Sequence, residues 1–270
     1  MHAVLAFDIE TIPDISGLRA IHDLSPDMPD TDVAEWALQR QRARNGSDFL
    51  PHHLHRAVAI SCVLRWGQDK LHIATLGSAD SSERDMIAAF FALVEKYTPQ
   101  LVSWNGGGFD LPALQYRALI NGIAAPRYWD QGDGDYADSR DFKWNNYISR
   151  YHSRHLDLMD VMALYQPRAS APLDDIARLC GFPGKLGMDG SKVWQAFQDG
   201  RINDIRDYCE TDAANTYLVF LRFQLLRGAL SPDEYAAEVG RVRDWVAQQA
   251  GDHPHWQAFV AAWPAGGRPV

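Results

Sequence analysis

Two periodicities of apolar residues divide the chain into expected strands and helices. Short runs of apolar and β-branched residues predict strands over 3–7, 57–66, 70–76, 101–104 and 155–158. Gly67-Gln68-Asp69 predicts a hairpin turn between the second and third of these strands. Apolar residues at helical spacing predict helices over 82–97, 111–121, 173–180, 191–198, 202–226 and from 231 onward.

The order of these elements predicts an α/β fold. Three strands, a helix, a strand and a helix are expected of a ribonuclease-H-like core, a mixed sheet flanked by helices. Its first three strands are antiparallel, and parallel strands follow the helical crossovers. We assign residues 1–225 to this domain, with insertions at about 14–56 and 127–151. Residues 226–270 are interpreted as a helical extension of the same domain.

Composition excludes some classes of protein and leaves others open. The chain has 270 residues, 46% of them apolar, and lacks an apolar run long enough to span a membrane. The first residues do not resemble a secretion signal, and the three cysteines form no disulfide framework, so we expect a cytoplasmic protein. A net charge of −9 argues mildly against nucleic acid, unless bound cations supply the positive charge.

Three short motifs contain residues that could carry chemistry. Asp8 and Glu10 share one face of the first strand, and adjacent carboxylates of this kind favour a divalent cation. Asp110 follows a glycine-rich turn at the start of a helix, where open α/β sheets place their sites. Tyr208 and Asp212 share one face of a late helix.

Each motif also has an ordinary structural interpretation. The acids on the first strand could simply be solvated where the strand ends. Asp110 could be a helix N-cap. Tyr208 and Asp212 could belong to the core and the edge of an amphipathic helix. The combination of the three motifs and their order along the chain are more specific than any one of them.

At this point the sequence resembles the DEDD exonuclease superfamily, in its tyrosine-bearing (DEDDy) subgroup. That superfamily carries Asp-x-Glu on the first strand, Asn-x(2–3)-(Phe/Tyr)-Asp before a helix, and Tyr-x-x-x-Asp on a late helix. Here these motifs stand as Asp8-Ile9-Glu10, Asn105-Gly106-Gly107-Gly108-Phe109-Asp110 and Tyr208-Cys209-Glu210-Thr211-Asp212. Over most of residues 1–225 the chain is similar to predicted 3′→5′ exonucleases related to the proofreading domain of B-family DNA polymerases.

The resemblance implies a two-metal mechanism at a 3′ end. Asp8, Glu10 and Asp212 would bind the Mg²⁺ or Mn²⁺ ion that activates the attacking water. Asp8 would bridge to a second ion anchored by Asp110, and Tyr208 would orient the water. The expected product is a nucleoside 5′-monophosphate, cut from DNA with a single-stranded or accessible 3′ end, in a repair or trimming role.

Neighbouring residues are candidates for substrate contacts, each with a structural alternative. Thr11 and Ile12 follow the first motif, Asn105 and Phe109 belong to the second, and Lys185 lies in a Gly/Pro-rich loop that suits a phosphate contact. Asp157 or Asp160 could support the site's ligands from behind, and we favour a role as structural caps. The aromatic residues of 127–151 either stack on bases or cover an edge of the core.

Other functions remain open from the sequence. The motifs specify phosphodiester chemistry and not the sugar, so a 3′→5′ exoribonuclease is the alternative enzyme. A catalytically silent nucleic-acid-binding domain would usually have lost a ligand, yet all four carboxylates and Tyr208 are present. A sugar hydrolase with paired carboxylates would not explain the Tyr-x-x-x-Asp helix.

Overall fold

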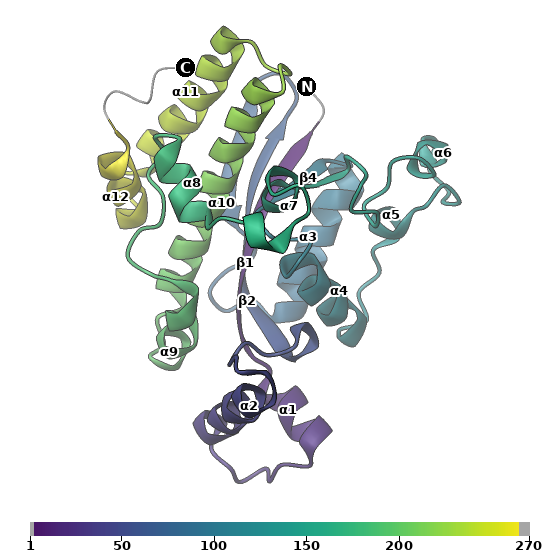
Figure 1. Ribbon diagram of the computed structural model, residues 1–270, viewed down its shortest axis with the longest axis vertical. Helices are drawn as coiled ribbons and strands as arrows, with labels where there is room; N and C mark the ends of the chain where they lie inside the picture. The colour runs from purple at the N-terminus through teal and green to yellow at the C-terminus, as the bar shows by residue number, and fades with distance from the viewer. Residues whose placement is uncertain (1–2, 265–270) are drawn as a thin grey trace.

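A five-stranded mixed sheet is the centre of the fold. Strand β1 (Val4–Pro13) pairs antiparallel with β2 (His55–Trp66), which pairs antiparallel with β3 (Lys70–Thr75). On its other side β1 pairs parallel with β4 (Gln100–Ser103), and β4 with β5 (His155–Asp157). The order β3-β2-β1-β4-β5 in this computed structural model (Figure 1) confirms the predicted ribonuclease-H-like sheet.

The structure describes residues 3–264. The ends of the predicted domain and of its extension, residues 1–2 and 265–270, lie outside the described residues. Within residues 3–264, no helix is both long and apolar enough to cross a membrane.

Side chains of β1 alternate between two apolar cores. Leu5 and Phe7 pack on the face that is covered by α3 (Glu83–Tyr97) and α4 (Asp110–Ile120). Val4 and Ala6 pack on the opposite face, covered by α8 (Leu173–Leu179), α10 (Ile202–Leu226) and α11 (Pro232–Gln249). Helices cover both faces of the sheet (Figure 1), so both faces of its strands are buried. This is why the sequences of the strands are nearly continuous apolar runs. The same alternation turns Asp8 and Glu10 toward α10.

In the second half of the chain, the helices that do not cover the sheet are short. The predicted helix over 191–198 begins as a 3₁₀ turn, η3 (Gly190–Lys192), before α9 (Val193–Gln198). Ser231 and Glu234 form a capping box at the start of α11, the helix predicted from 231 onward. The others are α7 (Leu158–Met162), η2 (Pro167–Ala169) and α12 (Pro254–Ala262).

The insertion at 14–56 packs on its own small core beyond the ends of β1 and β2 (Figure 1). It contains α1 (Ile15–His22), α2 (Asp30–Asn45) and η1 (His52–Leu54). This core is made of Leu18, Val33, Ala37, Leu50 and Leu54.

Some aromatic residues of the insertion at 127–151 cover an edge of the core, and others are exposed. The insertion begins with α5 (Pro126–Trp129) and continues through α6 (Ser139–Phe142), which projects to the side in Figure 1. Tyr128, Phe142 and Tyr147 are buried and cover an edge of the core. Trp129 and Trp144 are exposed. Core packing therefore explains three of these rings and leaves others available to a ligand.

Candidate active site

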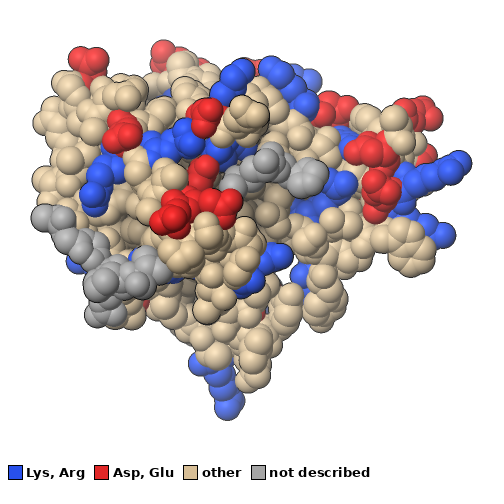
Figure 2. Space-filling model, turned by 90° about the horizontal axis from the view of Figure 1, so that it is seen from above, with Lys and Arg blue, Asp and Glu red and all other residues tan. Residues whose placement is uncertain are grey.

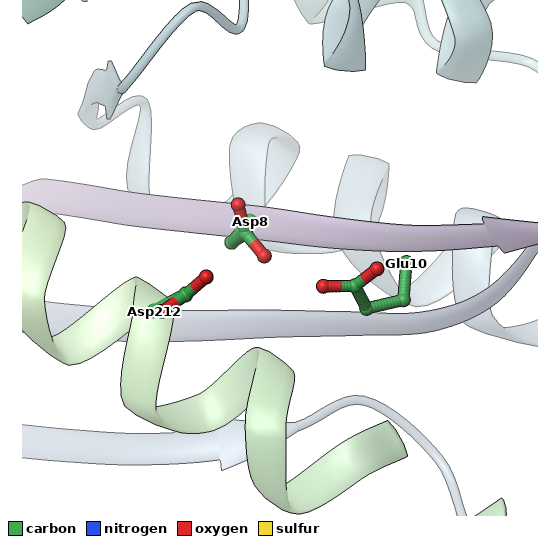
Figure 3. Close-up of side chains that lie close together, drawn as sticks. All are labelled: Asp8, Glu10 and Asp212. Carbon is green, nitrogen blue, oxygen red and sulfur yellow. The ribbon is translucent and has the colours of Figure 1, made fainter. Parts of the chain in front are cut away.

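Two carboxylate side chains of β1 point toward α10. Asp8 and Glu10 are two residues apart in an extended strand, so their side chains point the same way. Asp212 of α10 approaches them from the opposite side (Figure 3). One oxygen from each of the three carboxylates lies within 4.8 Å of the other two. Carboxylates this close repel one another unless they are protonated or share a cation.

A β-bulge follows the two acids. The pairing of β1 with β2 shifts between Glu10 and Thr11, and Val58 is the extra residue on β2. Beyond the bulge, Thr11 is partly exposed, and its hydroxyl lies 2.9 Å from Nδ1 of His55. Ile12 is buried. Of these two predicted substrate contacts, Thr11 is therefore the more accessible to a ligand.

The glycine-rich loop between β4 and α4 is held in place by Asp157. The carboxylate of Asp157 accepts hydrogen bonds from the backbone N–H groups of Asn105 at 2.9 Å and Gly107 at 2.8 Å. Asn105 adopts a φ of 65°. A Cβ on Gly106 would lie 2.3 Å from the Oγ of Ser103, so the turn requires glycine there. The carboxylate of Asp157 also caps α7, which agrees with the predicted structural role.

Asp110 is the buried first residue of α4. The N-cap position of this helix belongs to the apolar residue Phe109, so the carboxylate of Asp110 is not the cap that its position suggested. It lies outside the group formed by Asp8, Glu10 and Asp212, but its charge acts on Asp8. This place suits an anchor for a second cation.

Helix α10 presents Tyr208 and Asp212 on one face, and both side chains are buried. The ammonium group of Lys185 reaches them from the loop before α9. Its Nζ donates a hydrogen bond of 2.6 Å to the hydroxyl of Tyr208 and lies 3.5 Å from Oδ2 of Asp212. Since the side chain of Lys185 is still 35% exposed, it can contact both the acidic cluster and a ligand.

Burial raises the pKa of all four carboxyl groups. The pKa of Asp8 lies well above its ordinary value because of burial and the negative charges of Glu10, Asp110 and Asp212. Burial and Asp212 raise the pKa of Glu10 in the same way. Burial also raises the pKa of Asp110, to about 7, and that of Asp212, where Lys185 opposes the rise. The folded site therefore disfavours ionised carboxylates when no cation is bound.

The carboxylates fit a divalent cation. Besides the mutual repulsion, Oδ1 of Asp212 is buried without a hydrogen-bond partner among residues 3–264. A buried anionic oxygen in that condition is costly unless a ligand or proton compensates it. Hard cations such as Mg²⁺ and Mn²⁺ prefer oxygen donors of this type. In the described part of the chain, Asp8, Glu10 and Asp212 form the group of side chains that meets this requirement.

We expect the stability of the metal-free protein to fall as the pH rises. The pKa of Asp110 is about 7 in the folded protein against 3.8 ordinarily, so its contribution is full below about pH 4 and is lost through pH 7. The loss is on the order of a few kcal/mol. Thermal melts in EDTA between about pH 5 and pH 9 would measure it, and saturating Mg²⁺ should flatten the slope.

Asp110→Asn is the matched variant for that measurement, because it removes the titrating group and keeps the size of the side chain. Its melting temperature in EDTA should depend less on pH than that of the wild type. An equal slope in both proteins would show that Asp110 is not the group responsible.

A groove of about 470 Å³ begins at Glu10 and follows the end of β1. Three aromatic residues from separate segments line it: Phe49 of the 14–56 insertion, Phe109 of the glycine-rich loop and Trp194 of α9. Phe49 is 52% exposed, and its ring centroid lies 5.2 Å from that of Phe109. Thr11 lines the same groove. A cavity of this size with a few polar groups is typical of small-molecule sites.

The sequence patterns did not predict that Phe49 and Trp194 line the groove. The spacing of residues along the chain does not indicate that these segments meet, because their contact depends on how the insertion packs. One local signal was present, since Phe49 is a lone aromatic residue after the polar stretch 44–48. His52 and His55 pack on the rings of Phe49 and Phe109, and Nε2 of His52 lies 2.8 Å from the carbonyl oxygen of Gly108.

A family model described as a predicted 3′-5′ exonuclease related to the exonuclease domain of PolB matches residues 47–263. This segment contains Asp110, Tyr208 and Asp212, whereas Asp8 and Glu10 precede it. No curated protein matches the chain.

Among solved structures, the family B DNA polymerase from the hyperthermophilic archaeon Pyrobaculum calidifontis is similar, with 20% sequence identity and a TM-score of 0.48. The match covers 83% of this chain and 25% of the polymerase chain. The chain thus spans about a quarter of the length of that polymerase.

Proposed function

Since the chain belongs to the family of predicted 3′-5′ exonucleases related to the exonuclease domain of PolB, we propose that it removes nucleoside 5′-monophosphates from DNA 3′ ends. The reaction is a metal-dependent hydrolysis of phosphodiester bonds. The observation that carries this proposal is the meeting of Asp8, Glu10 and Asp212 in one cluster, with the charge of Asp110 acting on Asp8. A two-metal hydrolysis at phosphorus requires oxygen donors arranged in this way.

In this proposal the four carboxylates hold two divalent ions, Mg²⁺ or Mn²⁺. Asp8, Glu10 and Asp212 would bind one ion, and Asp8 and Asp110 would bind the other. Bound ions of this kind activate a water molecule and stabilise both the attacking and the leaving oxygens of an in-line displacement. The contribution of the chain is to hold the donors on a strand and two helices, which are more rigid than loops.

Tyr208 would position the attacking water. Burial, followed by the charges of Asp212, Glu10 and Asp8, raises the pKa of the Tyr208 hydroxyl well above its ordinary value of 10. The phenol therefore keeps its proton at neutral pH and acts through a hydrogen bond, not as a base. Lys185 would leave its contact with Tyr208 to bind an oxygen of the scissile phosphate.

The Tyr208→Phe variant tests this role. We expect kcat to fall about 10- to 100-fold, as for loss of one positioned hydrogen bond, while KM for DNA stays near that of the wild type. Steady-state rates on a single-stranded oligonucleotide would measure both constants. Tyr217→Phe removes a hydroxyl from the same helix away from the cluster and should leave kcat unchanged. A raised KM with an unchanged kcat in Tyr208→Phe would contradict the positioning role.

The groove at the end of β1 would receive the terminal nucleotide. Thr11 and Asn105 would contact the sugar, and the ring of Phe109 would contact the base, with Ile12 packed beneath. The walls of the groove come from the 14–56 insertion on one side and α9 on the other. The proposal places a single-stranded or frayed 3′ end in this groove.

The acidic charge of the chain is compatible with this substrate. The face seen in Figure 2 shows Lys and Arg side chains mixed with Asp and Glu, and the arm around α6 carries both signs. In this proposal, cations bound by the carboxylates supply the positive charge that attracts the phosphate. We place the activity in DNA repair or trimming in the cytoplasm, which agrees with the buried thiols Cys62 and Cys209.

A single assay tests the proposed function. Purified protein would be incubated with a single-stranded DNA labelled at its 5′ end, in Mg²⁺, Mn²⁺ or EDTA, with a matched RNA alongside. A metal-dependent ladder that shortens from the 3′ end is expected, faster on DNA than on RNA. Faster cleavage of RNA would instead identify an exoribonuclease. Retention of binding without cleavage of either polymer would identify a silent nucleic-acid-binding domain.

A further inference from the structure

An exposed aromatic patch lies beyond the end of β5, outside the site described above. The ring centroids of Tyr151 and Tyr165 are 5.2 Å apart with an interplanar angle of 66°. The guanidinium of Arg150 lies 5.0 Å from the ring of Tyr165 and 5.9 Å from that of Tyr151. Tyr151 is 74% exposed, and Met162 and Leu164, which come shortly before Tyr165 in the chain, are also exposed. We call these five residues the edge patch: Arg150, Tyr151, Met162, Leu164 and Tyr165.

The backbone holds the edge patch in a strained shape. Leu164 and Tyr165 have φ values of 50° and 59°, a region that large L-residues rarely adopt. The N–H of Tyr165 donates a hydrogen bond of 2.7 Å to the carbonyl oxygen of Asp160, and the carboxylate of Asp160 accepts one of 2.6 Å from Arg150. These bonds fix a conformation that keeps apolar side chains in solvent. Strain of this kind concentrates at sites that bind ligands.

The edge patch is joined to the candidate active site through one carboxylate. Asp157 accepts a hydrogen bond from the N–H of Asp160 on one side, and it holds the glycine-rich loop that leads to Asp110 on the other. Helix α7, which precedes Leu164, contacts both β4 and β5 (Figure 1). Strand β5 lies two strand spacings from β1, or about 10 Å. The edge-patch residues flank β5 in the chain, two strands away from the strand that carries Asp8.

We propose that the edge patch is a stacking platform for the strand upstream of the scissile phosphodiester. The proposal rests on the proposed function. With the terminal nucleotide in the groove at the end of β1, the rest of the strand must leave on the opposite side of the scissile phosphate. That side runs past Asp110 across β4 toward β5, where the edge patch lies.

The chemistry of the edge patch suits a single-stranded nucleic acid. Aromatic rings stack on any base, and a guanidinium beside them adds a cation that can bind the backbone phosphate. Arg150 is half exposed, so a phosphate can replace or join its contact with Asp160. Because stacking tolerates every base, the edge patch would strengthen binding of longer strands without reading their sequence.

The experiment compares substrates that do and do not reach the edge patch. The rate constant kcat/KM would be measured in Mg²⁺ for a dinucleotide and for a single-stranded dodecanucleotide. We expect Tyr151→Ala to lower kcat/KM for the longer strand about tenfold and to leave the dinucleotide unchanged. Tyr151→Phe retains the ring and should behave as the wild type. Tyr116→Ala is the control, since Tyr116 is an exposed aromatic residue on α4 (46%) and lies outside the edge patch.

The possible outcomes separate this proposal from the proposed function. Equal rates of wild type and Tyr151→Ala on both substrates would overturn the stacking platform and leave the exonuclease activity standing. A variant that is slower on both substrates would overturn it as well, because the loss would then be structural. If the wild type is a dimer in solution and Tyr151→Ala a monomer with unchanged rates, the edge patch is an interface between copies. Failure of the wild type to cleave either substrate would overturn the proposed function itself.

Discussion

The Asp8→Asn variant should lose most of its exonuclease activity and gain stability when no metal is bound. Asp8 is the carboxylate that both ions would share in the proposed mechanism. Loss of a residue that only supports a ligand lowers activity 10- to 100-fold, so loss of the shared ligand should lower kcat by roughly 10³-fold or more. Rates on single-stranded DNA in saturating Mg²⁺ and Mn²⁺ would measure the effect.

The gain in stability has a separate physical cause. Burial and three negative neighbours raise the pKa of Asp8, so at neutral pH the folded protein holds a carboxylate that resists ionisation. The amide of asparagine has a similar shape and no charge. In EDTA the variant should melt at a higher temperature than the wild type, and added Mg²⁺ should raise that temperature less.

Asp175→Asn is a suitable control, because it makes the same chemical change at an exposed position. It should alter neither the rate nor the effect of Mg²⁺ on melting. Wild-type activity in Asp8→Asn would contradict the assignment of Asp8 as a ligand. Loss of activity together with a lower melting temperature in EDTA would show that Asp8 has a structural role.

The parts of the site that lie within one element could be predicted from the sequence. Strand alternation places Asp8 and Glu10 on one face, and helical spacing does the same for Tyr208 and Asp212. That β1 and α10 face each other does not follow from either pattern. It came from the resemblance to a known family, and the structure brings three of these carboxylates within 4.8 Å of one another.

Residues on loops were predictable only where their surroundings carried a signal. Lys185 stood out as a lysine in a Gly/Pro-rich loop, and it reaches Tyr208. Phe49 and Trp194 line the groove although they are 145 residues apart (194 − 49), and no periodicity relates them. Their positions depend on the packing of the 14–56 insertion, whose small core is separate from the two cores of the sheet. Local patterns therefore indicated the clustered carboxylates better than the walls of the groove.

The 14–56 insertion is attached to the sheet by a buried cluster of charges. Arg117 of α4 donates hydrogen bonds of 2.8 and 2.6 Å to the two carboxylate oxygens of Glu83, and another to Asp14, the first residue of the insertion. Glu83 also accepts a hydrogen bond from the N–H of Ala57, where the insertion returns to β2. Although burial raises the pKa of Asp14, its contacts with Arg117 and its neighbours lower that pKa overall. One guanidinium thus fixes both ends of the insertion.

Arg117→Met should therefore destabilise the protein by about 3–5 kcal/mol, because two buried carboxylates are left without their partner. Urea unfolding at neutral pH would measure the loss. Arg42→Met removes an exposed ion pair with Asp48, so it should change stability by less than about 1 kcal/mol. Adding Asp14→Asn and Glu83→Gln to Arg117→Met should recover part of the loss, since the buried charges disappear.

The same variant tests whether the insertion shapes the groove. If Arg117 fixes the position of Asp14, its loss should let Phe49 and the end of β1 shift relative to each other. Below the melting temperature of the variant, KM for single-stranded DNA should then rise while kcat changes little, because the carboxylates on β1 and α10 are held by other contacts. A fall in kcat at an unchanged KM would show instead that the insertion controls the geometry of the acidic cluster.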